Sequence, residues 1–541
     1  MPNFLSHILQ DKDAIASQLL STLSLEEKIA ALIHIPAWSY RGQAHLEELE
    51  RTISQYKVGG IIFFQGDPET QARWTKHLQG ISQRPLLVGF DGEWGLGMRL
   101  NQSPIFPYAM TMGAMRESHL VYEMGKEVAR QLQQIGVHIN YAPVVDINTN
   151  PKNPVIGFRS FGSDIQNVID KAWAYASGME DQGVMAVFKH FPGHGDTSTD
   201  SHLTLPVLKH NEERLQQVEL APYKELIQRG ASSIMSTHIH IPVWDDATNR
   251  AATHSPTIIT DILQKQLGFQ GMVFTDALDM KGVSGFAGPA EINAKALLAG
   301  HDVLLFCVDV PGTIEAVVSE VEKGNISETE IERRFLKTFN LQRYFSENPH
   351  QQGAWEKEQA FEQTSKIILP MAEQSVSWWK KSSSSAAMEE RTCFVVDMKN
   401  KRRDELKHHQ LTFKGGKEYD RGALFTQKLG DQGIPSQWLR VEDKKWVDPI
   451  DKPSIVMVQG LEVKAKDKFG MDERLLDWID QQLASGNCQL VWMASPYGLS
   501  FLKNINQAEA VLLTYQEGEE FEQVAVDVLL GKREGVGHLP V

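Results

Sequence analysis

The sequence predicts an α/β protein: a (β/α)8 barrel of the TIM type, followed by a smaller three-layer α/β/α sandwich domain. Three observations lead to this fold class. The chain has 541 residues, too many for one ordinary domain. Eight short apolar runs rich in β-branched residues occur before about residue 310, with helical patterns between them. After about residue 345 the texture becomes polar, and a second, shorter series of strand and helix patterns follows.

The eight apolar runs are nearly continuous, which is typical of parallel strands covered on both faces. Eight strands that alternate with helices suit a closed barrel, whereas doubly wound sheets rarely need so many. Helical spacing is clear in 117–135, 163–182 and 211–228. The predicted strands are AALIHIPAW (30–38), VGGIIFFQG (58–66), PLLVGFDG (85–92), GVHINYAPVVDIN (136–148), GVMAVFKHF (183–191), SSIMSTHIHI (232–241), GMVFTDAL (271–278) and DVLLFCVD (302–309).

The second half of the chain divides at a polar segment. We expect residues 1–345 to form the barrel, 346–390 a linker with a returning helix, and 391–541 the sandwich domain. No Gly-rich phosphate loop follows the strands of this last domain. Its predicted strands are TCFVVDM (392–398), SIVMVQG (454–460), CQLVWMAS (488–495) and AEAVLLTY (508–515), and its predicted helices are MDERLLDWIDQQLAS (471–485) and EEFEQVAVDVLLG (519–531).

Composition and charge exclude several function classes. Lys plus Arg total 54 and Asp plus Glu total 69, a net charge of −15, so the surface repels nucleic acid and anionic membranes at long range. No apolar stretch approaches the 18 residues of a membrane span. The three cysteines are few, odd in number and far apart, which argues against a disulfide framework. The first forty residues lack a signal-peptide pattern, so we expect a cytoplasmic protein, or a periplasmic or exported one if a leader was trimmed.

Polar residues recur where the predicted barrel strands end, and the functional residues of a barrel lie at that face. Each such residue alone is more simply explained as a cap of a strand–helix loop. Their convergence on one mouth reverses that interpretation and favours a binding or catalytic site. The residues are Asp91, Asp146, Lys189, His190, His238, His240 and Asp276, joined by Arg159 in the loop after the fourth strand.

The densest polar segment is KHFPGHGDTSTDSH, from Lys189 to His202. Its glycines and its few apolar residues are typical of a mobile lid over a barrel mouth. Asp200 and His202 are two residues apart, so the carboxylate can approach the imidazole and support a general acid/base. A solvated loop whose aspartates bond their own backbone is an equally good explanation from composition alone.

Asp276 is the better of two candidate nucleophiles in VFTDALDM. It follows an apolar strand directly, so its carboxylate would be desolvated, held in place and aimed at the barrel axis. Asp279 comes three residues later, in the first turn of the next predicted helix, where it would only favour the helix dipole.

Two other motifs must be compared with the patterns of metal sites and dinucleotide sites. His238 and His240 share one face of a strand, which is metal-ligand geometry. Metal-dependent barrel hydrolases normally place such a pair in an earlier strand, so a metal site at His238 and His240 is the weaker interpretation. The segment GEWGLG (92–97) does not have the GxGxxG spacing of a dinucleotide site.

These motifs together resemble a known family. KHFPGHGDTSTDSH resembles the signature of the β-N-acetylglucosaminidases of glycoside hydrolase family 3, and the resemblance covers most of residues 20–345. NYAPVVDIN with NPKNPVIGFRSFG, SSIMSTHIHIPVWD and LGFQGMVFTDALDM follow in the family's order. The tail, AVLLTY followed by LLGKREGVGHLPV, resembles the close of the family's C-terminal domain.

The resemblance implies a role for each candidate residue. Asp276 becomes the catalytic nucleophile, His202 the general acid/base and Asp200 its partner. One departure stands out: after Asp91 the family pattern reads DxEGGxVxR, whereas this chain has DGEWGLGMR, with Trp94 in place of a glycine and Gly97 in place of a valine. The residues implied to bind sugar hydroxyls are Asp91, Arg99, Arg159, Lys189, His190 and His238.

The implied activity is that of a retaining exo-β-N-acetylhexosaminidase acting on a small carbohydrate, such as a muropeptide or a chitin fragment, without cofactor or metal. A family 3 β-glucosidase and a phosphate-dependent phosphorylase are the same-class alternatives. A metal-dependent barrel hydrolase is the alternative from another class, and a non-catalytic sugar-binding protein is a third. We expect the protein not to bind nucleic acid and not to contain a membrane-spanning segment.

Overall fold

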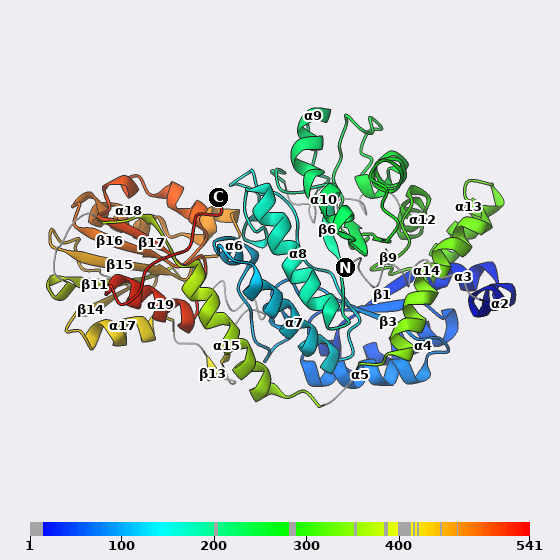
Figure 1. Ribbon diagram of the computed structural model, residues 1–541, viewed down its shortest axis with the longest axis horizontal. Coiled ribbons are helices and arrows are strands. Elements are labelled where there is room, and N and C mark those ends of the chain that lie inside the picture. The colour runs from blue at the N-terminus through cyan, green and yellow to red at the C-terminus, as the bar shows by residue number, and fades with distance from the viewer. Residues whose placement is uncertain are drawn as a thin grey trace.

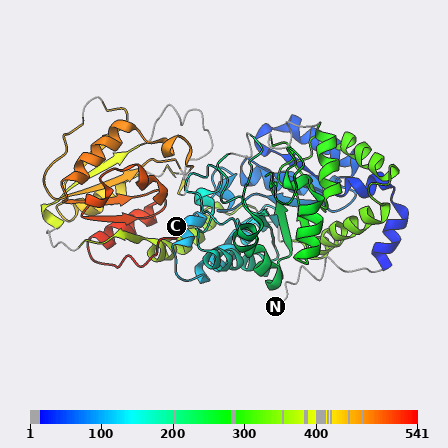
Figure 2. The ribbon, with the colours of Figure 1, turned by 90° about the horizontal axis from the view of Figure 1, so that it is seen from above.

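The computed structural model describes residues 14–199, 204–280, 288–350, 354–382, 388–398, 413–414, 417–418, 421–443, 446–462 and 464–541. Figure 1 shows a large body, coloured blue to green, beside a smaller body, coloured yellow to red. Figure 2 shows the same two bodies from above, again side by side along the long axis.

The larger body is the predicted eight-stranded barrel. Every predicted run contains a strand, and the fifth run contains two short ones in succession, β5 and β6. The strands are β1 Ile33–Ala37, β2 Gly60–Phe63, β3 Leu87–Phe90, β4 Ile139–Asn140, β5 Met185–Ala186, β6 Phe188–Phe191, β7 Ser233–Ser236, β8 Met272–Phe274 and β9 Leu304–Leu305.

The strands close into a ring through parallel pairing. One sheet has the order β5-β4-β3-β2-β1-β9, and a second has the order β6-β7-β8. Single parallel bridges, Val144 with Lys189 and Phe274 with Val303, join the two sheets at both ends. The predicted fold class is therefore confirmed.

Helices cover the outside of the ring, and local capping explains where several of them begin. Asp67 caps α5 through the N–H of Thr70, and Asp164 caps α8 through the N–H of Asn167. The main covering helices are α4 Gln43–Tyr56, α5 Pro68–Ile81, α7 His119–Gln134, α8 Ile165–Asp181, α10 Ala221–Arg229, α12 Pro289–Ala299, α13 Val310–Glu322 and α14 Glu328–Glu347.

The inside of the barrel is filled by side chains. The inward-facing residues form one apolar cluster that includes Ile62, Tyr141, Met185, Met235 and Phe274. Because this cluster fills the interior, the barrel offers its ligand site at the mouth, where the carboxyl ends of the strands meet the loops.

The smaller body is a six-stranded sheet with the order β10-β17-β16-β15-β11-β14, in which only β10 is antiparallel to its neighbour. Four of its strands lie in the runs predicted from sequence. Two were not predicted: β10, which lies in the expected linker, and the half-exposed β14. The strands are β10 Ser377–Lys380, β11 Thr392–Asp397, β14 Ser436–Arg440, β15 Ser454–Gln459, β16 Cys488–Trp492 and β17 Ala510–Leu513.

Alternating side chains of this sheet face two helical layers. In β11, Val395 packs in the cluster that includes α17 (Ala423–Gly430) and α19 (Glu519–Leu529). Its neighbour Val396 packs in the cluster that includes α18 (Glu473–Ala484). This alternation is the pattern of a three-layer α/β/α sandwich.

Helix α15 (Lys357–Ser375) joins the two bodies and packs against both α7 and α19. Gln131 Nε2 donates to Thr364 Oγ1 at 3.0 Å, and Ser365 Oγ donates to Glu520 Oε1 at 2.7 Å. Figure 1 shows this helix crossing between the bodies. The boundaries at residues 345 and 390 stay predictions. Strand β10, in the segment expected to be a linker, pairs with β17 of the second sheet.

Within the described parts of the chain, no helix has the combination of length and apolar character that crossing a membrane requires.

Candidate active site

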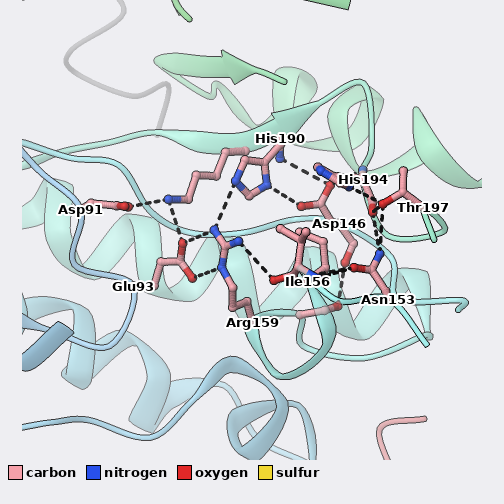
Figure 3. A network of polar contacts seen from close by, with 12 residues as sticks. Asp91, Glu93, Asp146, Asn153, Ile156, Arg159, His190, His194 and Thr197 are labelled. Atoms are coloured by element: carbon pink, nitrogen blue, oxygen red, sulfur yellow. Dashed lines mark hydrogen bonds and ion pairs between the residues drawn. The ribbon is translucent and has the colours of Figure 1, made fainter. Parts of the chain in front are cut away.

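A cluster of charged side chains lies at the carboxyl ends of β3, β4 and β6 (Figure 3). Asp91 and Asp146 follow β3 and β4, and Lys189 and His190 belong to β6 itself. Arg159 ends a short 3-10 helix, Gly157–Arg159, in the loop after β4. The strands of a barrel bring their carboxyl ends to one mouth, so residues far apart in sequence meet here.

Lys189 bridges two carboxylates. Its Nζ lies 2.6 Å from Asp91 Oδ1 and 2.8 Å from Glu93 Oε1, and its side chain is only 3% exposed. The guanidinium of Arg99 bonds the other oxygen of Asp91 and stacks on the ring of Phe64. Asp91 is therefore held from two sides.

Arg159 and Glu93 form a bidentate pair. Arg159 Nη2 lies 2.6 Å from Glu93 Oε1, and Arg159 Nε lies 2.9 Å from Glu93 Oε2. The Nη2 atom also lies 3.3 Å from His190 Nε2. Such fork-to-fork pairing fixes orientation as well as charge.

Asp146 anchors the next part of the mouth and is buried. Its Oδ2 lies 2.7 Å from His190 Nδ1, and its Oδ1 accepts the backbone N–H of His194 at 2.6 Å. The carboxylate assigns the proton of His190 to Nδ1, which leaves Nε2 facing Arg159. Asn153 holds the other side of the loop by donating to the carbonyl of His194 at 2.8 Å.

The first part of the loop predicted to be a lid is a fixed part of the site. Residues 191–195 are buried, and His194 Nδ1 lies 2.6 Å from Thr197 Oγ1. At Gly195 a Cβ would lie 1.8 Å from the carbonyl oxygen of Ile147, so the two segments approach too closely for any other residue. The predicted mobility is wrong for this part, because the glycine serves close packing.

The carboxylates of the cluster keep their charge despite burial. Burial alone would raise the pKa of Glu93, but Arg159 and Lys189 outweigh it and lower that pKa to about 2. Burial opposes the same effect at Asp91, where Lys189 and Arg99 hold the pKa well below its usual range. Burial would lower the pKa of Lys189, yet Asp91 and Glu93 raise it.

The charges of the cluster are paired. Asp91 contacts Arg99 and Lys189, Glu93 contacts Arg159 and Lys189, and Asp146 contacts His190. Such a site offers many fixed donors and acceptors whose charges already have partners. It therefore suits an uncharged ligand rich in hydroxyl groups better than an anion or a cation.

Asp276 follows β8, across the ring from Asp91, which follows β3. Its side chain is half-buried, and its Oδ1 accepts the N–H of Ala277 at 2.8 Å. Only β7 separates β8 from β6, the strand that carries Lys189 and His190 of the charged cluster.

His238 lies behind Asp276 and is fully buried. Its Nε2 lies 3.0 Å from the carbonyl oxygen of Ala277, and its Nδ1 lies 2.8 Å from Thr253 Oγ1. These contacts tie His238 to the loop that carries Asp276. His240, the other member of the pair proposed as metal ligands, bonds the carbonyl of Arg250 through Nδ1 at 2.9 Å.

No group of three or more potential metal ligands gathers among the residues that the structure describes. Asp200 and His202, the predicted acid/base pair, lie outside those residues, so their roles stay predictions. The other predicted site residues divide between the charged cluster and the Asp276 loop.

Sequence reasoning placed Asp146 at the mouth but assigned it no role, and it assigned no role to Glu93, His194 or Asn153. The sequence did contain a signal for Glu93, because DGEWGLGMR keeps the glutamate of the pattern DxEGGxVxR. It also contained one for Asp146, which lies near the end of a predicted strand. Asn153 had none, because its role is to bond a backbone carbonyl of a distant loop.

A closed barrel whose mouth holds both a polar cluster and the carboxylate of Asp276 defines a barrel enzyme for a small polar substrate. Comparison with known proteins agrees and is more specific. Residues 24–341 match the family model described as Glycosyl hydrolase family 3 N terminal domain, so the chain belongs to glycosyl hydrolase family 3.

Curated relatives resemble the barrel half of the chain. Beta-hexosaminidase A of Pseudoalteromonas piscicida is 35% identical over 286 residues, which are 49% of this chain and 48% of that protein. A beta-hexosaminidase of Haemophilus influenzae is 31% identical over 299 residues, which are 54% of this chain and 82% of that protein. The chain thus matches about half the length of the first relative.

Solved structures resemble the whole chain. A glycoside hydrolase family 3 beta-N-acetylglucosaminidase from Paenibacillus sp. str. FPU-7 has a TM-score of 0.77 at 26% identity, covering 96% of this chain and 99% of that one. Beta-glucoside phosphorylase BglX has a TM-score of 0.82 at 20% identity, covering 100% and 97%, and shows the shared fold alone.

Proposed function

We propose that the protein is a retaining exo-β-N-acetylhexosaminidase that removes a terminal β-linked N-acetylhexosamine. The observation that carries the proposal is the arrangement of the mouth, where the polar cluster and Asp276 lie at the carboxyl ends of strands of one ring, with Asp91 across the ring from Asp276. A pyranose bound there can direct its hydroxyl groups to Asp91, Lys189, Arg159 and His190 while its anomeric carbon faces Asp276. The named activity of the relatives supports the N-acetylhexosamine as the sugar.

In the first step, an oxygen of Asp276 attacks the anomeric carbon and the bond to the leaving oxygen breaks. His202 gives its proton to that oxygen, which leaves as an alcohol, and the sugar stays bound to Asp276 as an ester. In the second step, the now neutral His202 takes a proton from water, whose oxygen attacks the same carbon and releases Asp276. Two inversions keep the β configuration. Asp200 orients His202 and supports its charged form.

Two alternatives share this chemistry. A β-glucosidase differs in the sugar, and a phosphorylase differs in the second nucleophile. A neutral imidazole does not repel phosphate as a carboxylate would, so phosphate can in principle replace water in the second step. Hydrolysis is the proposed reaction.

Turnover of aryl β-N-acetylglucosaminide and aryl β-glucoside, each with and without phosphate, tests the proposal. We expect the N-acetylglucosaminide to be the better substrate, the rate to be independent of phosphate, and the first product to be the β-anomer by NMR. Preference for the glucoside, formation of a sugar phosphate, or an α-anomer as first product would each contradict it.

A further inference from the structure

We propose that the second domain positions the sugar-binding loops of the barrel through Gln516 and an aromatic cluster formed by Trp94, Tyr108 and Phe158. The inference rests on the proposed function, because it assigns Glu93 and Arg159 to the substrate. These four residues act as positioning residues that need not touch the sugar.

Two pairs of neighbouring residues join the loop after β3 to the loop after β4. Glu93 and Arg159 form the bidentate ion pair, and the residues beside them in sequence, Trp94 and Phe158, bring their rings within 5.6 Å. Each loop therefore offers one polar and one aromatic side chain to the other loop. The contact between the two rings sets the distance between the two loops, and this distance determines the geometry of the ion pair between Glu93 and Arg159.

Tyr108 completes the aromatic cluster. The centroid of its ring lies 5.2 Å from that of Trp94 and 4.9 Å from that of Phe158, and the ring is nearly edge-on to both. Trp94 is 7% exposed and Phe158 6%, whereas Tyr108 is half-buried.

The path of the loop after β3 places Trp94 in this cluster. The N–H of Phe106 donates to the carbonyl of Trp94, and the N–H of Gly97 donates to the carbonyl of Pro104, both at 3.1 Å. At Gly97 a Cβ would lie 2.4 Å from Ile105 Cγ1, which excludes the valine of the family pattern. A glycine in place of Trp94 would leave Tyr108 and Phe158 without their partner.

Gln516 connects the cluster to the second domain. Its Oε1 accepts the backbone N–H of Tyr108 and the hydroxyl of Thr111, both at 2.8 Å, although 408 residues separate it from Tyr108. Gln516 follows β17, and its own carbonyl accepts the hydroxyl of Thr514 at 2.7 Å. The acceptor is thus held rigidly by the second sheet.

A second contact reaches the loop after β4. Asn148 Nδ2 donates to the hydroxyl oxygen of Tyr497 at 2.5 Å, and Asn148 lies two residues after Asp146. Tyr497 comes from the segment that follows β16, as Gln516 comes from the segment that follows β17. The carboxyl ends of two second-domain strands therefore hold the two loops that carry Glu93, Asp146 and Arg159.

The test compares Gln516→Leu with Gln516→Glu and with Gln482→Leu in the full chain. Leucine removes the acceptor and leaves two buried donors unpaired, whereas glutamate keeps an acceptor oxygen. Gln482 is the matched control, because it is fully buried in the second domain and its side chain bonds Ile450 and Ser454 there. The readouts are kcat and KM on the aryl N-acetylglucosaminide, Tm, and calorimetric binding of N-acetylglucosamine.

We expect Gln516→Leu to raise KM and the Kd for N-acetylglucosamine about tenfold while kcat changes less than about threefold. Gln516→Glu should restore most of the binding, and Gln482→Leu should lower Tm with binding unchanged. Trp94→Ala should weaken binding by a similar factor. In the double variant the loss should be smaller than the product of the two single losses, because both residues act through one cluster.

Unchanged sugar binding in Gln516→Leu, or an equal loss in Gln482→Leu, would overturn the inference and leave the proposed function standing. A wild-type protein that binds N-acetylglucosamine but turns over no aryl glycoside would overturn the proposed function, while the binding comparison would still decide the inference. A wild-type protein that neither binds nor turns over would overturn both.

Discussion

At the scale of single residues, the site depends on charges that are buried but shared. Lys189 bonds both Asp91 and Glu93, so removing its charge leaves each carboxylate with one cation, Arg99 for Asp91 and Arg159 for Glu93. Asp276 follows β8, across the ring from Asp91, which follows β3. That separation suits one carboxylate for attack and the others for holding hydroxyl groups.

Replacing Asp276 by Asn should lower kcat roughly 10⁴-fold or more, because an amide oxygen of similar size is a far weaker nucleophile. The variant should keep the Tm of the wild type. Steady-state turnover of an aryl N-acetylglucosaminide measures the loss, and a fluorinated mechanism-based sugar should label Asp276 in the wild type.

Asp279→Asn is the control, since Asp279 is exposed three residues further on, and it should turn over normally. A covalent label on Asp279, or on any glutamate, would refute the assignment of the nucleophile.

Replacing His202 by Ala should slow a substrate with a poor leaving group by about 10²–10⁴-fold, the usual contribution of general acid/base assistance. A dinitrophenyl glycoside needs little protonation, so its first step should survive much better. The second step still lacks a base, and azide should rescue it. Pre-steady-state bursts with both substrates separate the two steps.

Asp200→Ala should give a milder version of the same pattern through a misoriented imidazole. Equal losses for good and poor leaving groups, with no rescue by azide, would mean that His202 only positions the substrate.

At the scale of elements, a half-buried carboxyl of α8, Glu180, bonds β5 and the residue that precedes β7. Glu180 Oε1 accepts the hydroxyl of Ser232 at 2.6 Å and the N–H of Ala186 at 3.3 Å. Burial raises the pKa of Glu180 to about 8. The proton is therefore bound in the folded protein at pH values where the unfolded chain has lost it.

This shift makes stability depend on pH. The folded-state pKa is raised above the unfolded value, so the contribution of Glu180 is complete below about pH 4.5 and is lost as the pH rises toward 8. Glu180→Gln keeps both hydrogen bonds and removes the titration. The decline in Tm between pH 5 and pH 8 should be smaller in the variant than in the wild type.

The slope attributable to one such group is at most about 1.4 kcal/mol per pH unit. Thermal melts of wild type and Glu180→Gln at four pH values check this. Parallel Tm curves for the two proteins would show that Glu180 does not titrate in this range.

At the scale of the whole molecule, α15 joins the hydrophobic core of the barrel to that of the second domain. Met371 is fully buried in a cluster that contains barrel residues such as Val128 and second-domain residues such as Phe521. Met371→Ala should cost about 2–5 kcal/mol, the usual loss for a large side chain in a core. We expect the barrel and the second domain to unfold together, at a lower temperature than in the wild type.

Scanning calorimetry measures this, and Leu369→Ala is the control on the same helix. Leu369 is 37% exposed, so its truncation should leave the transition nearly unchanged. Two separate transitions, of which only one moves in Met371→Ala, would show that the bodies unfold independently.

The sequence by itself determined the barrel, because each strand is a local run of apolar residues and eight such runs alternating with helices favour one closed architecture. It also indicated most of the polar residues at the mouth, since those residues stand where the runs end. Strand β10 was not predicted, because SWWK in a polar segment becomes a strand only by pairing with β17.

Only the tertiary structure decided which of these side chains meet. Lys189 and Asp91 are 98 residues apart, and no local pattern states that their ion pair also includes Glu93. The same holds for the bond from Gln516 to the backbone of Tyr108, since a backbone donor carries no sequence signal. Local patterns fix elements, whereas a site depends on the distances between elements, which packing alone sets.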